Sequence, residues 1–207
     1  MPQEHYFSSE PTTNKNETEI SFEVAGAKFD MAAASGTFSS TKLDPGTKVL
    51  LSYTGLFPKD GTVLDLGCGW GPIGIVLASL SPETKVHAVD INQRSVGQTQ
   101  ANADRAGISN FQVHLAEDLP VNMKFDAIWS NPPIRIGKVA LHELLKKYLT
   151  RLEDGGKAYL VVQKNLGADS LQRWLAEEFP DHAVSRAGTA KTYRVIEVVS
   201  PARSQSK

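Results

Sequence analysis

The chain carries two different periods of hydrophobic and polar positions. Apolar and polar residues alternate over residues 19–33 around Ala25-Gly26, which predicts a β-hairpin. From residue 62 onwards, short apolar runs alternate with longer segments in which apolar residues recur at helical spacing. We expect strands at 62–67, 85–90, 111–116, 125–130, 157–163, 182–188 and 192–200, and helices at 71–80, 93–107, 139–156 and 168–179.

This alternation predicts an α/β fold with a mostly parallel, seven-stranded sheet and helices on both faces. The last two strands have no helix between them, which predicts an antiparallel C-terminal strand. Residues 1–57 are expected to form an N-terminal extension with a loose start, the hairpin and a helix over 46–57. Asp44 is the expected N-cap of that helix, with Pro45 at its first position. Residues 58–207 form the main part of what we predict to be one structural domain.

The composition changes this picture little. The 207 residues include 41% hydrophobic and 22% charged residues, with a net charge of −1, unlike a strongly basic nucleic-acid binder. No apolar run reaches the roughly 20 residues of a membrane helix, and the start lacks the apolar stretch of a secretory signal. We therefore expect a cytoplasmic protein. The single cysteine, Cys68, excludes an internal disulfide, and no residue group has metal-ligand spacing.

A glycine-rich turn follows the first strand of the expected sheet, in the sequence LDLGCGWG. Open α/β sheets bind ligands at the carboxyl ends of their strands, and Gly67, Gly69 and Gly71 would let the backbone approach a ligand closely. Packing of the helix on the strand is the alternative role of these glycines. Their spacing differs from the G-x-G-x-x-G of dinucleotide-binding proteins.

Acidic residues follow the next two strands. Asp90 ends one of them, where a carboxylate accepts hydrogen bonds from both hydroxyls of a ribose. Its alternative role is to cap the next helix, for which Asn92 is equally suited. Glu117 and Asp118 follow the next strand, where either could face an adenine amino group or simply solvent.

The fourth strand ends in SNPPIRIGK. Proline locks its own φ and biases the residue before it to extended shapes. Asn131, Pro132 and Pro133 are therefore expected to present rigid, preorganised hydrogen-bond acceptors, as a catalytic site requires. A plain loop breaker is the alternative, and the three other strand ends favour the catalytic role.

Together these residues resemble the class I S-adenosylmethionine-dependent methyltransferases over roughly residues 60–200. LDLGCGWG is similar to that family's glycine loop, and NPPI to the [DNS]-P-P-[YFWI] motif of enzymes that methylate exocyclic or amide nitrogens. The resemblance implies a Rossmann-like catalytic domain over 58–207 that uses S-adenosyl-L-methionine and releases S-adenosyl-L-homocysteine. It implies contacts with the cofactor from Phe38, Asp65, Gly67, Cys68, Gly69, Gly71, Asp90, Ile91, Glu117, Asp118 and Asn131.

The resemblance also implies a role for each acidic residue. Asp65 would neighbour the methionine ammonium, and Asp90 would bind the ribose. Glu117, or else Asp118, matches the position that contacts adenine. Cys68 lies in the glycine loop, where we interpret it as a small packing residue.

A narrower resemblance is carried by GTFSSTKLDPGTKVLL, NPPIRIGK, VVQKNLGA and TYRVIEV, with HYFSSEPTT near the start. These segments are similar to single-domain members of the small-subunit (16S) ribosomal RNA guanine-N2 methyltransferase family. In that family, the segment matched by Phe38, Ser39, Asp44, Gly46 and Thr47 packs over the cofactor site. The implied partner is ribosomal RNA, either naked or in a small-subunit assembly intermediate.

The motif implies four catalytic residues: Asn131, Pro132, Pro133 and Ile134. We expect the Asn131 side-chain oxygen and the Pro132 carbonyl to accept the N–H groups of the target, which aims the nitrogen lone pair at the methyl donor. Ile134 departs from the Tyr or Phe that stacks on the base in many nitrogen methyltransferases. Phe38 and Trp70 are the candidates to supply that stacking.

Arg135, Lys138 and Thr47 are expected to contact the substrate. The two cations would bind RNA phosphates, and their alternative is simple exposure to solvent at the start of the helix. Alternative targets are adenine N6 or a protein glutamine, although glutamine enzymes usually carry Tyr where this chain has Ile134. A non-catalytic cofactor- or RNA-binding module could have lost the glycine loop and Asn131, and both are present. The glycine spacing disfavours a nicotinamide-dependent dehydrogenase. The sequence indicates no oligomeric state.

Overall fold

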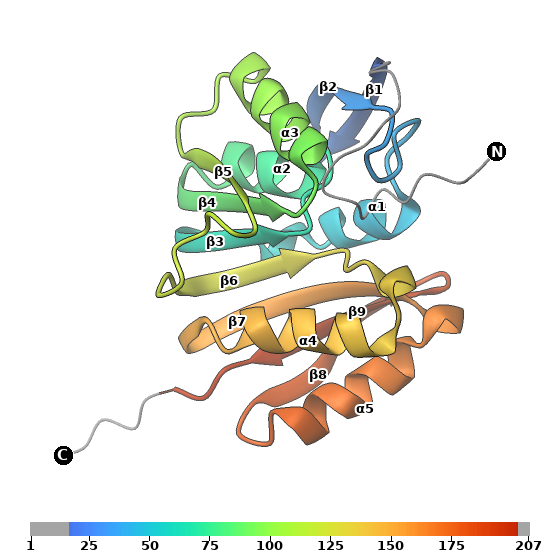
Figure 1. Cartoon of the computed structure of the whole chain (residues 1–207), viewed down its shortest axis with the longest axis vertical. Coiled ribbons are helices and arrows are strands. Elements are labelled where there is room, and N and C mark those ends of the chain that lie inside the picture. The colour runs from blue at the N-terminus through green and yellow to red at the C-terminus, as the bar shows by residue number, and fades with distance from the viewer. Residues whose placement is uncertain (1–16, 203–207) are drawn as a thin grey trace.

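The computed structural model describes residues 17–202 and begins with the expected hairpin (Figure 1). Strands β1 (Glu17–Val24) and β2 (Ala27–Ala34) pair antiparallel, with Val24 opposite Ala27. The two turn residues, Ala25 and Gly26, have φ values of 52° and 79°. Positive φ at both positions is the signature of a type I′ turn, whose twist suits a two-residue hairpin.

A loop leads from the hairpin into α1 (Pro45–Leu51), which is followed by the 3₁₀ turn η1 (Thr54–Leu56). Asp44 caps α1 and Pro45 occupies its first turn, as predicted. The helix ends six residues before the predicted residue 57, because Ser52 caps it and the chain tightens into η1.

Seven strands form one sheet in the order β5-β4-β3-β6-β7-β9-β8. Six of them run parallel, and β9 is antiparallel to both of its neighbours, which confirms the predicted sheet. The strands are β3 (Asp60–Leu66), β4 (Glu83–Asp90), β5 (Phe111–Leu115), β6 (Phe125–Ser130), β7 (Leu152–Gln163), β8 (Ala183–Ala190) and β9 (Tyr193–Val199).

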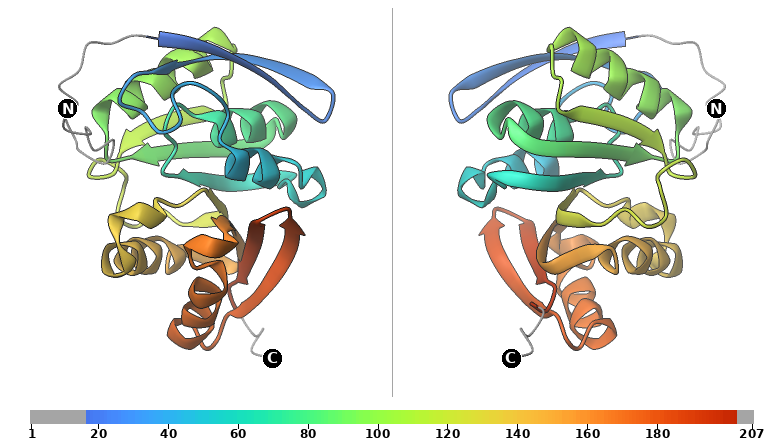
Figure 2. Two further views of the ribbon diagram at one scale, coloured as in Figure 1. Left: turned by 90° about the vertical axis from the view of Figure 1, so that its right-hand side faces the viewer. Right: turned by 90° about the vertical axis from the view of Figure 1, so that its left-hand side faces the viewer.

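Helices cover both faces of the sheet, and each face has its own hydrophobic core. Helices α1, α2 and α3 share one core with the hairpin, whereas α4 and α5 pack on the other face. Figure 2 shows the hairpin at one end of the molecule beside α3, and β8 and β9 at the opposite end. The remaining elements are α2 (Pro72–Leu80), α3 (Gln93–Arg105), α4 (Lys138–Leu149), α5 (Ala168–Glu178), η2 (Ile134–Ile136) and η3 (Lys164–Leu166).

The helix predicted over 139–156 is too long, because its last residues belong to a strand. Helix α4 ends at Leu149, and β7 begins at Leu152, which pairs with Phe125. The pairing shifts by a bulge before it resumes at Lys157, where the predicted strand began. Gly155, with a φ of 75°, takes a left-handed conformation that a helix interior does not allow.

The N-terminal extension packs on the core through buried side-chain hydrogen bonds as well as apolar contacts. Asn102 of α3 accepts a hydrogen bond from Ala32 N at 2.9 Å and donates one to Ala32 O at 2.7 Å. It also donates to Trp70 O at 2.9 Å. The edge of β2 is thereby tied to the glycine-rich turn. Nothing in the structure tests the predicted boundary at residue 57, which stays a prediction.

Candidate active site

The candidate site is a cavity of about 680 Å³ at the carboxyl ends of the central strands. In chain order, β3, β4 and β5 lie side by side toward one edge of the sheet, and β6 then lies on the other side of β3. Ligands of open α/β folds bind at such a switch in strand order. The cavity is lined by Leu66 at the end of β3, Gly67 after it, Asp90 of β4 and Asn131 after β6.

The glycine-rich turn reaches the cavity through Gly67. Gly67, Gly69 and Gly71 have φ values of 76°, 60° and 88°, which residues with a Cβ rarely adopt. A Cβ added to Gly67 would meet no protein atom within 4 Å, so it would stand in open space at the cavity wall. A Cβ on Gly71 would lie 2.7 Å from Thr99 Cγ2. Gly67 therefore leaves room for a ligand, whereas Gly71 is required for packing.

Asp90 lies at the cavity wall and does not cap α3. Its Oδ2 accepts a hydrogen bond from Gly69 N and its Oδ1 one from Asn92 N, both at 2.9 Å. The side chain of Asn92 caps α3 instead, accepting from Arg94 N at 2.9 Å. Burial raises the pKa of Asp90, while the backbone N–H groups oppose that shift. The carboxylate keeps lone pairs that can accept from hydroxyls of a ligand.

Asp65 and Cys68 lie behind the loop. Asp65 is fully buried and accepts from Gly74 N at 2.8 Å through Oδ2. Its Oδ1 has no hydrogen-bond partner among residues 17–202, and burial raises its pKa to about 7. The Cys68 thiol lies 3.5 Å from Thr99 Oγ1, and burial raises its pKa, so the thiol is unreactive at neutral pH. The interpretation of Cys68 as a packing residue fits this placement.

The two acidic residues after β5 lie away from the cavity lining. Glu117 and Asp118 are exposed, whereas Ala116 before them and Ile91 after β4 line the cavity. Ile91 is 49% exposed, which makes it an apolar surface for a flat ligand. The adenine-contacting role of Glu117 or Asp118 stays a prediction.

The turn after β6 is rigid. Ile134 N donates to Pro132 O at 2.8 Å across Pro133, whose φ and ψ are −75° and 74°. These values define an inverse γ-turn, which proline favours because its ring fixes φ. The Pro132 carbonyl therefore already accepts one hydrogen bond and has one lone pair left. Ser130, before the turn, ties β6 to β3 by donating to Leu66 O at 2.7 Å.

The side chain of Asn131 contacts the first turn of α1. Its Nδ2 donates to Asp44 Oδ2 at 2.8 Å and to Thr47 Oγ1 at 3.1 Å. Thr47, predicted to contact the substrate, is 3% exposed, and its hydroxyl faces Asn131. The sequence marked Asp44 as a helix cap and as part of a segment expected to pack over the cofactor site, but it gave no signal for this contact with Asn131.

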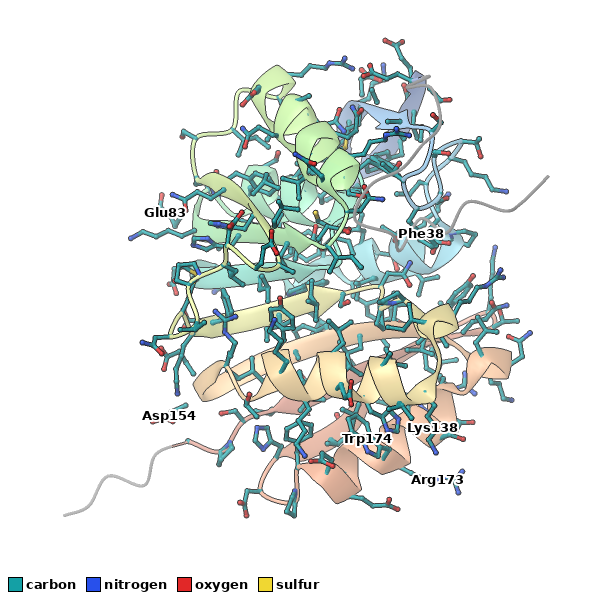
Figure 3. The ribbon with its side chains drawn as sticks, viewed as in Figure 1. Phe38, Glu83, Lys138, Asp154, Arg173 and Trp174 are labelled. Carbon is teal, nitrogen blue, oxygen red and sulfur yellow. The ribbon has the colours of Figure 1, made fainter. Side chains whose placement is uncertain are left out.

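Two aromatic side chains that line the cavity also reach solvent: Phe38 is exposed, and Tyr193 is partly buried. Trp70, the other stacking candidate, is 2% exposed and packs edge-on against Phe22, so the structure rules it out. Tyr193 was missed, because its place at the cavity depends on the antiparallel pairing of β9 with β7. In Figure 3, Phe38 and Lys138 lie on the side where β3, β4 and β6 end, away from Glu83 and Asp154.

Basic residues lie near the mouth of the cavity. Arg135 is exposed and lines it, and Lys147 lines it from α4. Lys138 is exposed at the start of α4 but does not line the cavity. Among residues 17–202, no group of three or more His, Cys, Asp or Glu side chains could hold a metal ion. No helix in this part of the chain is long and apolar enough to span a membrane.

A family model described as "Methyltransferase small domain" matches residues 28–197, which is most of the chain. The chain belongs to this methyltransferase family. The match includes the glycine-rich turn, Asp90 and the NPPI turn, and it confirms the family predicted from those motifs.

The methyltransferase is similar to proteins of very different length. It is 34% identical to "Uncharacterized protein YbxB" of Bacillus subtilis (strain 168), over 93% of this chain and 96% of that protein. It is also 34% identical to "Ribosomal RNA small subunit methyltransferase C" of Acinetobacter baylyi, over 67% of this chain and 43% of the relative. The chain thus spans less than half the length of this named ribosomal RNA methyltransferase.

A solved structure has the same fold. It is titled the T. thermophilus 16S rRNA N2 G1207 methyltransferase (RsmC) in complex with AdoMet and guanosine. The TM-score is 0.77 at 25% identity, over 92% of this methyltransferase and 52% of that chain. The class I methyltransferase fold predicted from the sequence is thereby confirmed.

Proposed function

We propose that this methyltransferase transfers a methyl group from S-adenosyl-L-methionine to an exocyclic amino nitrogen in RNA, guanine N2 of small-subunit ribosomal RNA. One observation carries the proposal: a single cavity is lined by Gly67 of the glycine-rich turn and Asp90, which we call the cofactor end, and by Asn131, which we call the transfer end. A donor and an acceptor nitrogen bound in one cavity gain the proximity that such a transfer needs.

The cofactor end fits S-adenosyl-L-methionine. The open space above Gly67 suits a ligand backbone close to the turn, and Asp90 can accept hydrogen bonds from ribose hydroxyls. Ile91 and Phe38 offer apolar surfaces beside them. When bound, the cofactor supplies an electrophilic methyl group on a sulfonium. The chain needs neither a nucleophilic side chain nor a metal for this reaction.

The transfer end supplies acceptors for an amino group. Asn131 Oδ1 and the free lone pair of Pro132 O are the polar groups of the rigid turn, and each can accept one N–H of the target. These hydrogen bonds favour a pyramidal nitrogen with an available lone pair, which a base-conjugated amine otherwise lacks. Ile134 supplies an apolar contact, while the rings of Phe38 and Tyr193 can take the stacking role.

The names of the relatives support RNA as the target. Two of them act on ribosomal RNA by name, and the solved RsmC structure holds guanosine. The large-subunit relative, "Ribosomal RNA large subunit methyltransferase G" of Shewanella putrefaciens, is 29% identical over 72% of this chain and 41% of the relative. Arg135 and Lys138 are the proposed contacts to RNA phosphates, and the cytoplasm is the proposed location.

The proposal is tested by transfer of a tritiated methyl group from labelled cofactor to ribosomal RNA. The RNA comes from a strain that lacks this protein, both as naked RNA and as small subunits, and the product is digested to nucleosides. We expect the label in N2-methylguanosine. Label in N6-methyladenosine would move the target to adenine, and label only in protein would overturn the proposal of an RNA substrate.

A binding measurement separates the remaining alternatives. Calorimetry with S-adenosyl-L-methionine and with NAD should show binding of the first alone. If the cofactor binds and neither RNA nor protein accepts a methyl group, the chain is a non-catalytic binding module. If NAD binds instead, the methyltransferase proposal fails at its first step.

A further inference from the structure

The amide of Asn131 has both of its N–H groups committed to the protein. A primary amide carries two such donors, and Nδ2 gives one to Asp44 Oδ2 and one to Thr47 Oγ1. An ionised carboxylate accepts hydrogen bonds and cannot donate them, so the nitrogen, and not the oxygen, must face Asp44. The carbonyl Oδ1 is consequently the polar atom of this side chain that remains for a ligand.

The carboxylate that holds the amide is itself fixed. Asp44 Oδ2 accepts from Gly46 N at 2.7 Å and from Thr47 N at 3.1 Å as it caps α1. A Cβ on Gly46 would lie 2.9 Å from this same oxygen and 3.0 Å from Tyr193 Cε1. Glycine at this position therefore lets the carboxylate and the Tyr193 ring lie together against the first turn of the helix.

The backbone of Asn131 is fixed as well. Ser130 before it ties β6 to β3, and the inverse γ-turn at Pro133 follows it. With its backbone and both amide N–H groups held, the side chain cannot turn over to present its nitrogen without losing two hydrogen bonds. The bond to Asp44 is the stronger of the two, because its acceptor is a carboxylate.

We propose that Asp44 and Thr47 are positioning residues that lock the Asn131 amide, so that the site takes only targets that donate N–H groups. This inference rests on the proposed function and narrows its substrate. A ring carbonyl or a phosphate oxygen placed against Oδ1 would meet another acceptor and be rejected. Donation from Nδ2 to a carboxylate also polarises the amide, which strengthens Oδ1 as an acceptor.

The lock is tested first without cofactor or substrate, by NMR of the ¹⁵N-labelled chain. The Asn131 side chain should give two separate N–H signals that are protected from exchange with water, identified by their loss in Asn131→Ala. Thr47→Val keeps the shape of the side chain and removes one acceptor. We expect one signal to shift and to exchange roughly tenfold faster, the equivalent of one hydrogen bond.

Thr47→Ser is the matched control, since it keeps the hydroxyl and should keep both protected signals. Signals in the wild-type protein that exchange as fast as those of an exposed asparagine would overturn the lock. So would a Thr47→Val spectrum identical to that of the wild type. Binding of S-adenosylhomocysteine should stay within about twofold in both variants, because neither changes the Asp90 end.

The substrate class is tested with guanosine and inosine, which differ only by the exocyclic amino group. With S-adenosylhomocysteine present, we expect the wild type to bind guanosine at least about tenfold more tightly, and Thr47→Val to lose most of that preference. Asp44→Asn keeps a cap but offers a neutral acceptor, so its preference should fall between the two. Equal affinities of the wild type for both nucleosides would overturn the inference.

The two proposals fail in different ways. If the protected signals and the guanosine preference are found but no RNA accepts a methyl group, the lock stands and the proposed function fails. If ribosomal RNA is methylated while the amide exchanges freely in the cofactor-free protein and in the complex with S-adenosylhomocysteine, the function stands and the lock fails.

Discussion

The two ends of the cavity are built in different ways. The cofactor end comes from two turns that follow neighbouring strands, and these turns hold each other through the bond from Gly69 N to Asp90. The transfer end comes from segments far apart in the sequence. Asn131 lies 87 residues from Asp44 and 84 from Thr47, which hold it, and Tyr193 of a third segment packs beside them.

Because of this difference, we expect mutations to affect cofactor binding and methyl transfer separately. The cofactor end is a set of backbone N–H groups and carboxylates at the ends of two paired strands, β3 and β4. The transfer end exists only when α1, the end of β6 and the start of β9 have all docked. Changes at the first end should therefore act on cofactor affinity, and changes at the second on the transfer step, with little crossover.

The largest effect is expected from Asn131→Ala. Removing the acceptor at the point of transfer should lower the methylation rate by roughly 10³-fold, as for other preorganised acceptors and donors. The dissociation constant of the cofactor should change less than about twofold. Single-turnover methylation of ribosomal RNA and calorimetry give the two numbers. Equal losses in both would show that the two ends are not separable.

At the opposite end, Asp90→Ala should weaken cofactor binding by roughly 30- to 100-fold, since it removes charge-assisted hydrogen bonds to the ligand. The rate at saturating cofactor should fall far less. Glu83→Gln is the control, because Glu83 is exposed on the side of the sheet away from the cavity (Figure 3), and its effect should stay below about twofold. Glu117→Gln tests the predicted adenine contact, which a loss of affinity comparable to that of Asp90→Ala would confirm.

The features that the sequence placed at both ends of the cavity are local ones. The glycine-rich turn, Asp90 and Asn92 lie within local patterns that have a fixed meaning in an α/β fold. The hairpin turn and the cap at Asp44 are local in the same sense, and both are confirmed. The NPPI motif located Asn131 at its strand end, and its catalytic role stays a prediction.

What the sequence could not predict depends on tertiary contacts. A cap signal at Asp44 says nothing about a second partner 87 residues away. The place of Tyr193 follows from an antiparallel register that no local pattern encodes. The end of α4 was misplaced because the residues after it, which pair with β6 through a bulge, carry few apolar side chains to mark a strand.

A smaller effect is expected at the wall of the transfer end. Tyr193→Ala should raise the KM for ribosomal RNA by roughly tenfold, within the range of about 1–3 kcal/mol that one base–aromatic contact contributes. Tyr193→Phe keeps the ring and should stay within about twofold of the wild type. Cofactor affinity should not change in either variant. If Phe lost as much as Ala, the hydroxyl, rather than the ring, would be the functional group.

The last prediction concerns the effect of pH on Asp65 at the cofactor end. It should change the stability of the fold clearly and methyl transfer least. Burial raises the pKa of Asp65 from 3.8 to about 7, so the folded chain binds a proton that the unfolded chain has released between these values. Stability should therefore fall as pH rises through this window and level off above it. The measurement is the Tm of the cofactor-free wild type against pH, from which the Tm of Asp65→Asn at the same pH is subtracted. The subtraction cancels the contribution of His87, whose pKa is lowered to about 4 and which therefore makes stability rise with pH. Thr47→Val, which leaves Asp65 in place, should show no such trend relative to the wild type. A difference curve that is flat, or that rises with pH, would mean that Asp65 is ionised in the folded chain.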